Sequence, residues 1–526
     1  MQNSLRHRKP TITHGPAMKS TDMKSSEPLH ELYKVQFPRT VYYIQTAILV
    51  GLLLVLVAQL ELRRLALSNQ LVLQRSSWDA NATIREKQPC DRSPVVWVRG
   101  RNTETGYLKH VIRVFEQLGY RVSGKTDDWL VLWSHEYPFG DLSYEMMHLK
   151  QHQRVNHFPG SGYITNKVSL STGSNSAYVP KAFKLPHQKE DFLSEVQRYP
   201  NQLWVQKGNH HRGIQIKSIN ELSLDQNGTF IQEFITNPLL IDGKKFDIGV
   251  YTLMTSLNPL RVYTYSGDVL LRFCSKSYNN PFDPQDIDSY VVGDDYTPVW
   301  QMPSLNNFYV NGSLTMKETL NLYLRKLEKD EKKMWTEIES AIASVYFEKE
   351  RDMINAGTKY KASGRTTNFF ELVRFDFVID EELRVFLMEA NMSPNLSSAH
   401  FSQNSVLYEQ VMYNVLNVIG LGNSATRAAN KHDDFVVSDK NIMVYPDLCF
   451  GDECLKCTAN AKCKLCNKCL TRTQKRILKD TFVEHLNRGD LTRIIPPKIK
   501  RVLSPVNELL WLWFEGKCQL ESHFCT

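Results

Sequence analysis

The stretch "FFELVRFDFVIDEELRVFLMEANMSPNLSS", Phe369 to Ser398, decides the fold because it holds two apolar runs with acidic and amide side chains at fixed places. The polar residues Asp380, Glu381 and Glu382 separate the two runs. Two apolar runs joined by a short polar turn are typical of a β-hairpin. The stretch therefore predicts two paired strands that meet near residue 381.

The position of the turn sets which side chains face each other across this hairpin. A tip at Glu381-Glu382 places Asp376 opposite Leu387. The same register places Glu389 opposite Arg374, so that Asp376 and Glu389 become diagonal neighbours on one sheet face. We therefore expect the two carboxylates to lie within reach of each other.

Asn391 lies two residues after Glu389 and points to the same face, because strand side chains alternate with period two. Two carboxylates and an amide oxygen are hard oxygen ligands, which suit Mg²⁺ bound together with substrate phosphates. The alternative is a hairpin that merely carries exposed polar residues. The spacing alone leaves both readings open.

Composition bounds the class of protein. The chain has 526 residues, of which 42% are hydrophobic and 23% charged, so it is long enough for two or more lobes with a large core. Its formal net charge is +8 and its pI about 8.8. This charge favours an acidic partner, and nucleic acid, anionic lipid and an acidic protein tail are all compatible with it.

Residues 41–60, "VYYIQTAILVGLLLVLVAQL", carry no formal charge. A helix of this length spans roughly 30 Å, the thickness of a bilayer core. We therefore predict one transmembrane helix here, the lipid bilayer as a partner and a single-pass membrane localisation. The side on which the body lies stays open. Residues 1–40 are predicted to be disordered and 61–92 to form a stalk.

The body opens as an α/β unit. Residues 95–100 and 127–138 are expected to form strands, and 106–120 an amphipathic helix between them. We expect this unit to extend from about residue 94 to 425. A separate cysteine-rich and basic region, 441–526, follows it.

The C-terminal cysteines permit two interpretations. CxxC spacing suits zinc in a reducing compartment, whereas the same residues form disulfides in an oxidising one. Four N-glycosylation sequons, which mark a possible glycoprotein, give the second interpretation some weight. The cysteines are Cys449, Cys454, Cys457, Cys463, Cys466, Cys469, Cys518 and Cys525, and the sequons begin at Asn81, Asn227, Asn311 and Asn395.

Four blocks in the body together resemble the tubulin tyrosine ligase-like family. They are "RVNHFPGSGYITNK" (154–167), "WVQKGNHHRGIQI" (204–216), "FIQEFITNPLLIDGKKFDIGVYTLMTSLNPLRVYTYSGDVLLRF" (230–273) and the hairpin stretch. The resemblance implies an α/β ATP-grasp fold with a Rossmann-like N-terminal lobe. It also implies an ATP- and Mg²⁺-dependent ligase that joins an amino acid to a protein carboxylate through an acyl phosphate.

The resemblance also implies roles for individual residues. Asp376, Glu389 and Asn391 would hold Mg²⁺ against the ATP phosphates. Arg272, Lys245 and Asp247 would be catalytic, with Arg272 facing the acyl phosphate. The ATP-binding residues would be Lys167, Lys207, Arg212, Gly213, Ile214, Gln232, Glu233, Phe234, Ile235, Lys245 and Asp247.

The sequence departs from the family pattern beside the active site. The family usually has arginine where this chain has Gly249, and a small residue where it has Arg374. Glycine offers no cation and weakens a strand. The nucleotide and metal residues match the family, so two interpretations stay open. One is a ligase with altered substrate handling, and the other is an impaired pseudo-ligase that binds ATP or a partner, for which the secretory lumen is one compatible location.

The substrate follows from the resemblance alone. Glutamate is the default amino acid, and tubulin or the microtubule is the expected acceptor if the body is cytosolic. No nucleic-acid partner is expected. The basic stretch 472–501 begins as an amphipathic helix that would suit the acidic tubulin tails, although a solvated helix face explains it equally well.

Overall fold

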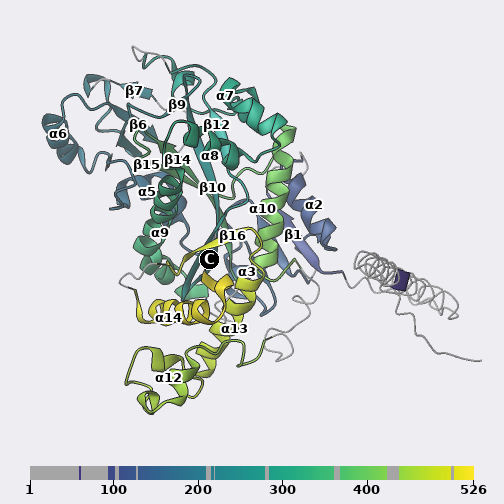
Figure 1. Cartoon of the computed structure of the whole chain (residues 1–526). Helices are drawn as coiled ribbons and strands as arrows, with labels where there is room; N and C mark the ends of the chain where they lie inside the picture. The colour runs from purple at the N-terminus through teal and green to yellow at the C-terminus, as the bar shows by residue number, and fades with distance from the viewer. Residues whose placement is uncertain are drawn as a thin grey trace, which may run out of the picture. The chain divides into compact units, whose positions relative to one another are not determined.

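The computed structural model describes residues 59–60, 93–100, 103, 106–125, 128–208, 215–217, 219–278, 283–360, 368–422, 437–498 and 503–525. The chain divides into two compact units, Met1–Asp91 and Arg92–Thr526. The strands and helices named below all belong to the second unit (Figure 1). They form a mixed α/β fold built on three sheets.

A four-stranded parallel sheet opens the second unit. Helix α2 (Lys109–Gln117) packs against it through the buried side chains of Val111, Val114 and Phe115, which recur at helical spacing. The predicted strand, helix and strand of this region are thus confirmed. The sheet order is β2 (Arg121–Ser123), β1 (Val95–Arg99), β3 (Val131–Ser134) and β4 (Arg154–Val155).

A small antiparallel sheet follows. Helix α6 (Lys189–Arg198) covers it, and Phe192 of this helix packs edge-on against Phe183 and Trp204 of the sheet. These aromatic contacts fix the helix to the sheet. The strand order is β5 (Ala182–Lys184), β8 (Thr229–Glu233), β6 (Trp204–Gly208) and β7 (Gln215–Lys217).

The large sheet has eight strands around β10. Strand β10 is buried along nearly its whole length, and the polar side chains of Lys245, Asp247 and Thr252 are buried with the apolar ones. Strands β12, β11 and β14 pair with different parts of it. The bounds are β9 (Leu240–Ile241), β10 (Lys244–Leu257), β11 (Leu260–Tyr265), β12 (Leu270–Phe273), β13 (Thr297–Pro298), β14 (Glu371–Ile379), β15 (Val385–Met392) and β16 (Leu491–Ile495).

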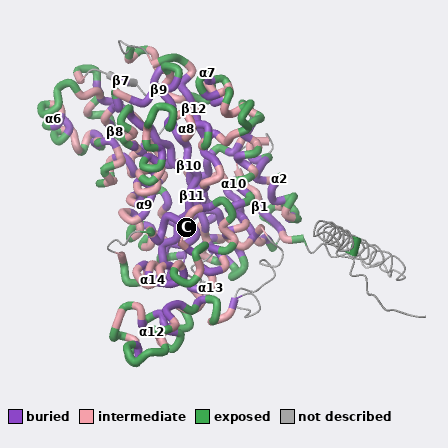
Figure 2. Tube along the Cα trace, viewed as in Figure 1, coloured by how far each residue is buried: buried purple, intermediate pink, exposed green. Residues whose placement is uncertain are grey.

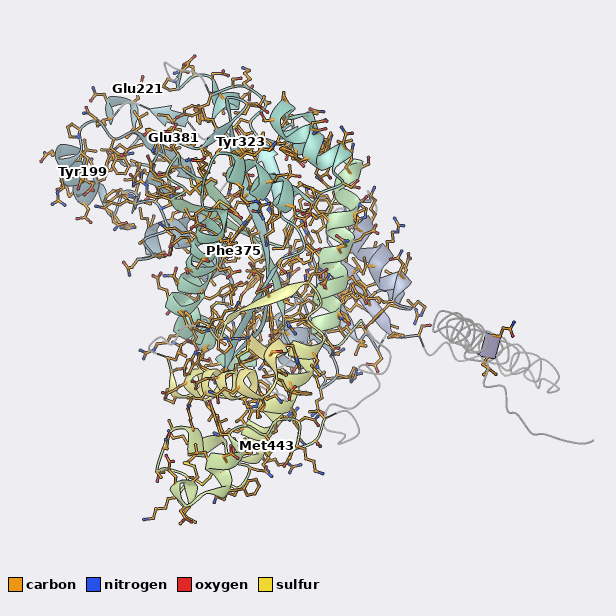
Figure 3. The ribbon with its side chains drawn as sticks, viewed as in Figure 1. Tyr199, Glu221, Tyr323, Phe375, Glu381 and Met443 are labelled. Atoms are coloured by element: carbon orange, nitrogen blue, oxygen red, sulfur yellow. A yellow bond between two sulfur atoms is a disulfide. The ribbon has the colours of Figure 1, made fainter. Side chains whose placement is uncertain are left out.

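Helices cover the large sheet and bury its apolar side chains. Figure 2 shows a continuous buried path along β10 and β11, with exposed residues on the outer helices. Phe375, at the centre of Figure 3, is fully buried in β14. The principal helices are α8 (Met316–Lys326), α9 (Glu331–Ala356) and α10 (Ser405–Val418), and the shorter ones are α3 (Ser143–Met147), α4 (Gly162–Thr165), α5 (Lys167–Gly173) and α7 (Pro303–Asn306).

The C-terminal region forms its own core around Trp513 and also supplies strand β16 to the large sheet. Helix α13 (Arg472–Leu486) confirms the helix predicted at the start of the basic stretch, and Thr471 caps it through a capping box with Gln474. Helices α12 (Pro446–Phe450) and α14 (Pro505–Leu520) complete this region.

The C-terminal cysteines are paired in four disulfides. The pairs are Cys449–Cys466, Cys454–Cys463, Cys457–Cys469 and Cys518–Cys525. Oxidised sulfur is no zinc ligand, because zinc binds the thiolate. In the described part of the chain no group of three or more His, Cys, Asp or Glu side chains is arranged to hold a metal ion. The zinc interpretation is therefore not supported.

The predicted single-pass membrane localisation is corrected here. Among the residues that the structure describes, no helix is both long enough and apolar enough to cross a bilayer. The bilayer as a partner is unsupported for the same reason. Residues 41–58 of the predicted transmembrane segment lie outside the described residues.

Candidate active site

The β14–β15 hairpin brings the two predicted carboxylates together. Asp376 lies directly opposite Glu389 in the ladder, and Arg374 lies opposite Asn391. The predicted register, with Asp376 opposite Leu387, is wrong. The two carboxylates nevertheless lie close together, as predicted, and they are direct rather than diagonal neighbours across the ladder.

The register differs from the prediction for two reasons. The turn has three residues at its tip instead of two, because the Asp380 N–H donates to the Arg384 carbonyl at 3.1 Å and Leu383 takes the left-handed conformation with φ 60°. The ladder also shifts register between Asp376 and Phe377. A bulge of this kind re-aims the side chains that follow it.

Asn391 joins the two carboxylates. Its Nδ2 donates to Asp376 Oδ2 at 2.9 Å and to Glu389 Oε1 at 3.0 Å. The three residues predicted to hold Mg²⁺ therefore meet at one point. Their two carboxylates and one amide fit Mg²⁺ by the chemistry of the donor atoms, since this ion takes a few protein oxygens and completes its shell with phosphates and water.

Lys167, at the start of α5, reaches this cluster. Its Nζ lies 2.8 Å from Glu389 Oε2. Burial works against the ionised carboxylate, but Lys167, together with Asn391 and Arg374, outweighs burial and holds the pKa of Glu389 well below its usual range. Glu389 is therefore an anion at neutral pH, as a metal ligand must be.

Arg272 of β12 links the cluster to Asp247 of β10. Its Nε and Nη2 donate to the two oxygens of Asp247 at 2.9 and 2.8 Å, and Nη2 also donates to Asp376 Oδ2 at 2.9 Å. Burial raises the pKa of Asp247 and Arg272 lowers it again, which leaves it at about 6. The pair is ionised at pH 7, with Arg272 facing the metal-binding carboxylates.

Half-buried Lys207 and buried Lys245 complete the charged part of the site. Lys207 of β6 donates to Gln232 Oε1 at 2.8 Å, and burial lowers its pKa to about 8. Lys245 of β10 donates to the Tyr290 carbonyl at 3.0 Å, its ammonium lies 5.1 Å from the ring centre of Phe234, and burial lowers its pKa too. Because both amines are shielded in part from water, a phosphate beside their protonated forms would be bound more strongly than in open water.

These side chains line one cavity of about 170 Å³ between the small sheet and the large sheet. Its lining combines apolar and charged side chains, which is the mixture expected of a site for a nucleotide with its base and its phosphates. The apolar lining is Val205, Phe230, Phe234, Phe246, Tyr290, Val291, Val292, Val378 and Met388, and the charged lining is Lys167, Lys207, Glu233, Lys245, Asp247, Arg272, Asp376 and Glu389.

The predicted adenine hinge is only partly at the cavity. Glu233 and Phe234 line it, whereas Gln232 lies behind it and holds Lys207, and Ile235 is buried outside the lining. The predicted flap, Arg212 to Ile214, lies outside the described residues.

The sequence analysis missed most of the apolar wall, although a simple signal was present. Val205 and Val378 lie two residues from Lys207 and Asp376 in their strands, so each shares a face with its charged neighbour. Tyr290 could not be found in this way, because it lies in a connecting segment, where side chains do not alternate with a fixed period.

A second cavity, of about 680 Å³, lies beside the first and shares Lys167 with it. Asn391 also lines it, so both cavities reach the same cluster of side chains. The remaining lining residues are Tyr137, Gly160, Gly162, Tyr163, Thr165, Asn166, Ser169 and Met392.

Comparison with known proteins identifies the class as that of ligases. The sequence profile of the tubulin-tyrosine ligase family matches residues 145–427, more than half of the chain. The chain belongs to the tubulin-tyrosine ligase family.

Several curated relatives share this body. The probable tubulin polyglutamylase ttll-15 of Caenorhabditis elegans is 41% identical over 452 residues, which cover 83% of this chain and 87% of that protein. The mouse tubulin polyglutamylase TTLL6 is 29% identical over 60% of this chain, and the mouse tubulin monoglutamylase TTLL4 is 27% identical over 57%. The alignments cover only 39% and 26% of these two mouse proteins.

Proposed function

We propose that this chain is an ATP-grasp ligase that uses ATP to join glutamate to a glutamate side chain of tubulin. One observation carries the proposal: Asp376 and Glu389 line a cavity between two sheets and meet Asn391 there, with Lys167 and Arg272 bound to the two carboxylates. This arrangement suits phosphoryl transfer, which depends on positioning and on charge stabilisation.

Different residues of the cavity would bind the base and the phosphates of ATP. The apolar wall around Phe234 would hold the base, and Lys207, Lys167 and Arg272 would face the phosphates. Mg²⁺, held by Asp376, Glu389 and Asn391, would neutralise charge on the phosphoryl oxygens.

The reaction then takes two steps. The acceptor carboxylate takes the terminal phosphoryl group of ATP, which gives an acyl phosphate and ADP. The amine of the incoming glutamate attacks the acyl carbon, loses a proton, and phosphate leaves as the amide forms. Arg272 lies where it can stabilise the negative charge that develops on the phosphoryl and carbonyl oxygens.

The choice of glutamate and of tubulin is supported by the relatives, which are named as tubulin polyglutamylases and a monoglutamylase. Helix α13 supports an acidic acceptor less strongly than its sequence suggested. Its Lys475 and Lys479 both pair with Asp439, at 2.8 and 2.9 Å, which neutralises part of the basic face.

The proposal is tested by incubating the purified full chain with tubulin, labelled glutamate, ATP and Mg²⁺. We expect label on tubulin tail peptides, identified by mass spectrometry, and none when a non-hydrolysable ATP analogue replaces ATP. Label that enters tubulin without ATP, or no label under any condition in which the chain binds nucleotide, contradicts the proposal.

A second candidate function is a nucleotide- or partner-binding module of the secretory lumen. The four disulfides favour it, because such bonds persist in oxidising compartments. Asn227 of one sequon is exposed on the surface. An endoglycosidase-sensitive mass shift that Asn227→Gln removes supports this candidate and removes tubulin as the direct acceptor. A body that carries no glycan in cells contradicts it.

A further inference from the structure

A buried histidine joins the four-stranded parallel sheet to the metal-binding hairpin. His157 lies two residues after strand β4 and is buried. Its Nδ1 lies 3.1 Å from Oε1 of Glu371, the first residue of β14, and its Nε2 lies 2.8 Å from the carbonyl of Ser134, the last residue of β3. The hydroxyl of Ser393, which follows β15 directly, lies 3.2 Å from the same Nε2. One ring therefore contacts the parallel sheet and both strands of the hairpin at their ends.

The ring and Glu371 form one buried unit. Nε2 of His157 carries a hydrogen, because the Ser134 carbonyl can only accept a hydrogen bond. Nδ1 faces Glu371 Oε1, and the other oxygen of this fully buried carboxyl group accepts from the Phe158 N–H at 2.8 Å. Each oxygen of Glu371 thus has a partner from residues 157 and 158. Because an unpaired buried carboxyl group is costly, these contacts hold the segment after β4 on β14.

Ser393 has a backbone conformation that needs support. Its φ is 45°, in the left-handed region, which is uncommon for a residue with a side chain. The residue is buried, and its hydroxyl donates to the Ser134 carbonyl at 3.4 Å, beside His157 Nε2. A strained conformation persists only where the surrounding structure holds it. The contacts with Ser134 and His157 thus help to fix the direction in which the chain leaves β15.

The two segments that meet at His157 carry side chains of the candidate active site. Ser393 lies two residues after Asn391, the amide that bridges the metal-site carboxylates. His157 lies at the start of the segment that leads through α4 to Lys167, whose Nζ lies 2.8 Å from Glu389 Oε2. Segments 157–167 and 389–393 therefore touch at both of their ends, at His157 with Ser393 and at Lys167 with Glu389. The first contact constrains the geometry of the second.

We propose that His157 is a positioning residue, which acts through Ser393 to hold the metal-binding end of β15 against the segment that carries Lys167. This inference rests on the proposed ligase function. His157 lines neither of the two cavities, so its effect on the reaction runs through the residues that it holds. When the contact is lost, Asn391 and Lys167 are free to shift. A shift of about 1 Å in groups that align a reaction lowers its rate by up to about a hundredfold.

The first experiment measures ATP-dependent glutamate transfer by the full chain and by its His157→Gln and Ser393→Ala variants. We expect kcat to fall about tenfold or more in both, because residues that orient metal ligands typically contribute about 10- to 100-fold to activity or metal affinity. The Mg²⁺ concentration at half-maximal rate identifies the displaced group, since it rises if Asn391 moves and stays constant if only Lys167 moves. Exposed His152→Gln is the matched control and should behave as the unmodified chain.

A double variant separates positioning from a general loss of stability. His157→Gln combined with Ser393→Ala should have the kcat of His157→Gln alone, because both substitutions remove the same contact, whereas independent effects would multiply. An unchanged kcat in folded His157→Gln, with only a lower Tm, overturns the proposal and leaves the histidine with a structural role. Full turnover by Ser393→Ala overturns it as well, and this smaller change decides the matter if His157→Gln does not fold. Multiplying effects in the double variant also overturn it.

Binding tests the proposal without turnover, so that failure of the proposed function is recognised separately. Mg²⁺ should tighten the binding of a fluorescent, non-hydrolysable ATP analogue to the unmodified chain and to His152→Gln. In Ser393→Ala this gain should be smaller by about fivefold or more, while the analogue without Mg²⁺ binds within about twofold. An equal gain from Mg²⁺ in Ser393→Ala and the unmodified chain overturns the positioning role. No gain in the unmodified chain refutes the proposed metal site, and the inference falls with it.

Discussion

At the scale of single residues, burial decides the chemistry of the site. Lys207 has an ordinary pKa of 10.5, and burial lowers this to about 8 in the folded chain. The folded state therefore binds the proton less tightly than the unfolded state, and the free energy of unfolding should rise with pH between about 8 and 10.5. The affinity for phosphate has the opposite pH dependence: it falls as pH rises, because phosphate binding needs the protonated amine of Lys207.

We therefore predict that nucleotide affinity falls as pH rises above 8. Titrations with fluorescent ADP between pH 7 and 9 should show a loss approaching about tenfold per pH unit at the upper end. Lys207→Arg, which keeps its charge, should remove this slope. The same slope in Lys207→Arg would assign the titration to a different group.

The pair Gly249 and Arg374 leads to a second prediction at this scale. Gly249→Arg alone should lower both stability and activity, because its Cβ meets Arg374 Cδ at 2.9 Å while Asp376 holds that side chain in place. Overpacking of this kind typically costs about 1 to 3 kcal/mol. Urea unfolding and turnover of Gly249→Arg check this. A single variant as stable and as active as the unmodified chain contradicts it.

At the scale of elements, the hairpin sets the geometry of the site through its turn. The carboxylate of Asp380 is fully buried and accepts from the Arg384 N–H at 2.8 Å and from Arg384 Nε at 2.6 Å. Figure 3 marks Glu381 at the tip of this turn, where its N–H donates to the Asn237 carbonyl at 3.2 Å. The turn thus fixes both the register of the strands and their contact with the preceding segment.

Asp380→Ala should lower the free energy of unfolding by about 2 to 3 kcal/mol, because two backbone donors of the turn lose a buried, charged acceptor. Activity should fall further than stability explains, since Asp376 and Glu389 depend on this register. The exposed neighbour Glu381→Gln is the control and should change neither quantity. Urea unfolding monitored by tryptophan fluorescence measures the difference, and equal midpoints for the two variants would contradict it.

The hairpin also shows how far sequence reasoning reaches. The apolar runs and the polar turn predicted its existence and the convergence of Asp376, Glu389 and Asn391, because alternation in a strand is a local property. The register was not predictable, since it depends on a left-handed Leu383 and on a register shift between Asp376 and Phe377, neither of which the residue pattern indicates. The contact between Arg374 and Gly249 was not predictable either, because it depends on the pairing of two strands that are distant in the sequence.

At the scale of the whole molecule, parts distant in sequence build one sheet. Strand β16 follows the cysteine-rich segment, yet it pairs with β11 at the edge of the large sheet. Sequence analysis treated residues 441–526 as a separate region, because disulfide spacing is visible in a sequence whereas a short edge strand such as β16 is not. The segments before and after β16 share a core around Trp513, which is separate from the core of the large sheet.

Reduction of the disulfides should therefore loosen the cysteine-rich segment and spare the nucleotide site. Loss of one such bond typically costs about 2 to 4 kcal/mol of stability. Limited proteolysis after treatment with a reductant should cut between Cys449 and Cys469 first, while ADP affinity stays within about twofold. Non-reducing peptide mapping should recover the pairs Cys449–Cys466 and Cys454–Cys463. Reduction that abolishes ADP binding would show that the two parts are coupled.

The central claim is that Glu389 belongs to the phosphoryl-transfer centre of a ligase. The most direct measurement compares Glu389→Gln with Glu382→Gln, an exposed residue of the same hairpin, in ATP-dependent transfer of labelled glutamate to tubulin. We predict that Glu389→Gln loses transfer by at least about a hundredfold and still melts cooperatively, because it lacks a charge that holds the metal. Glu382→Gln should match the unmodified chain. Full turnover by Glu389→Gln would contradict the assignment of this site.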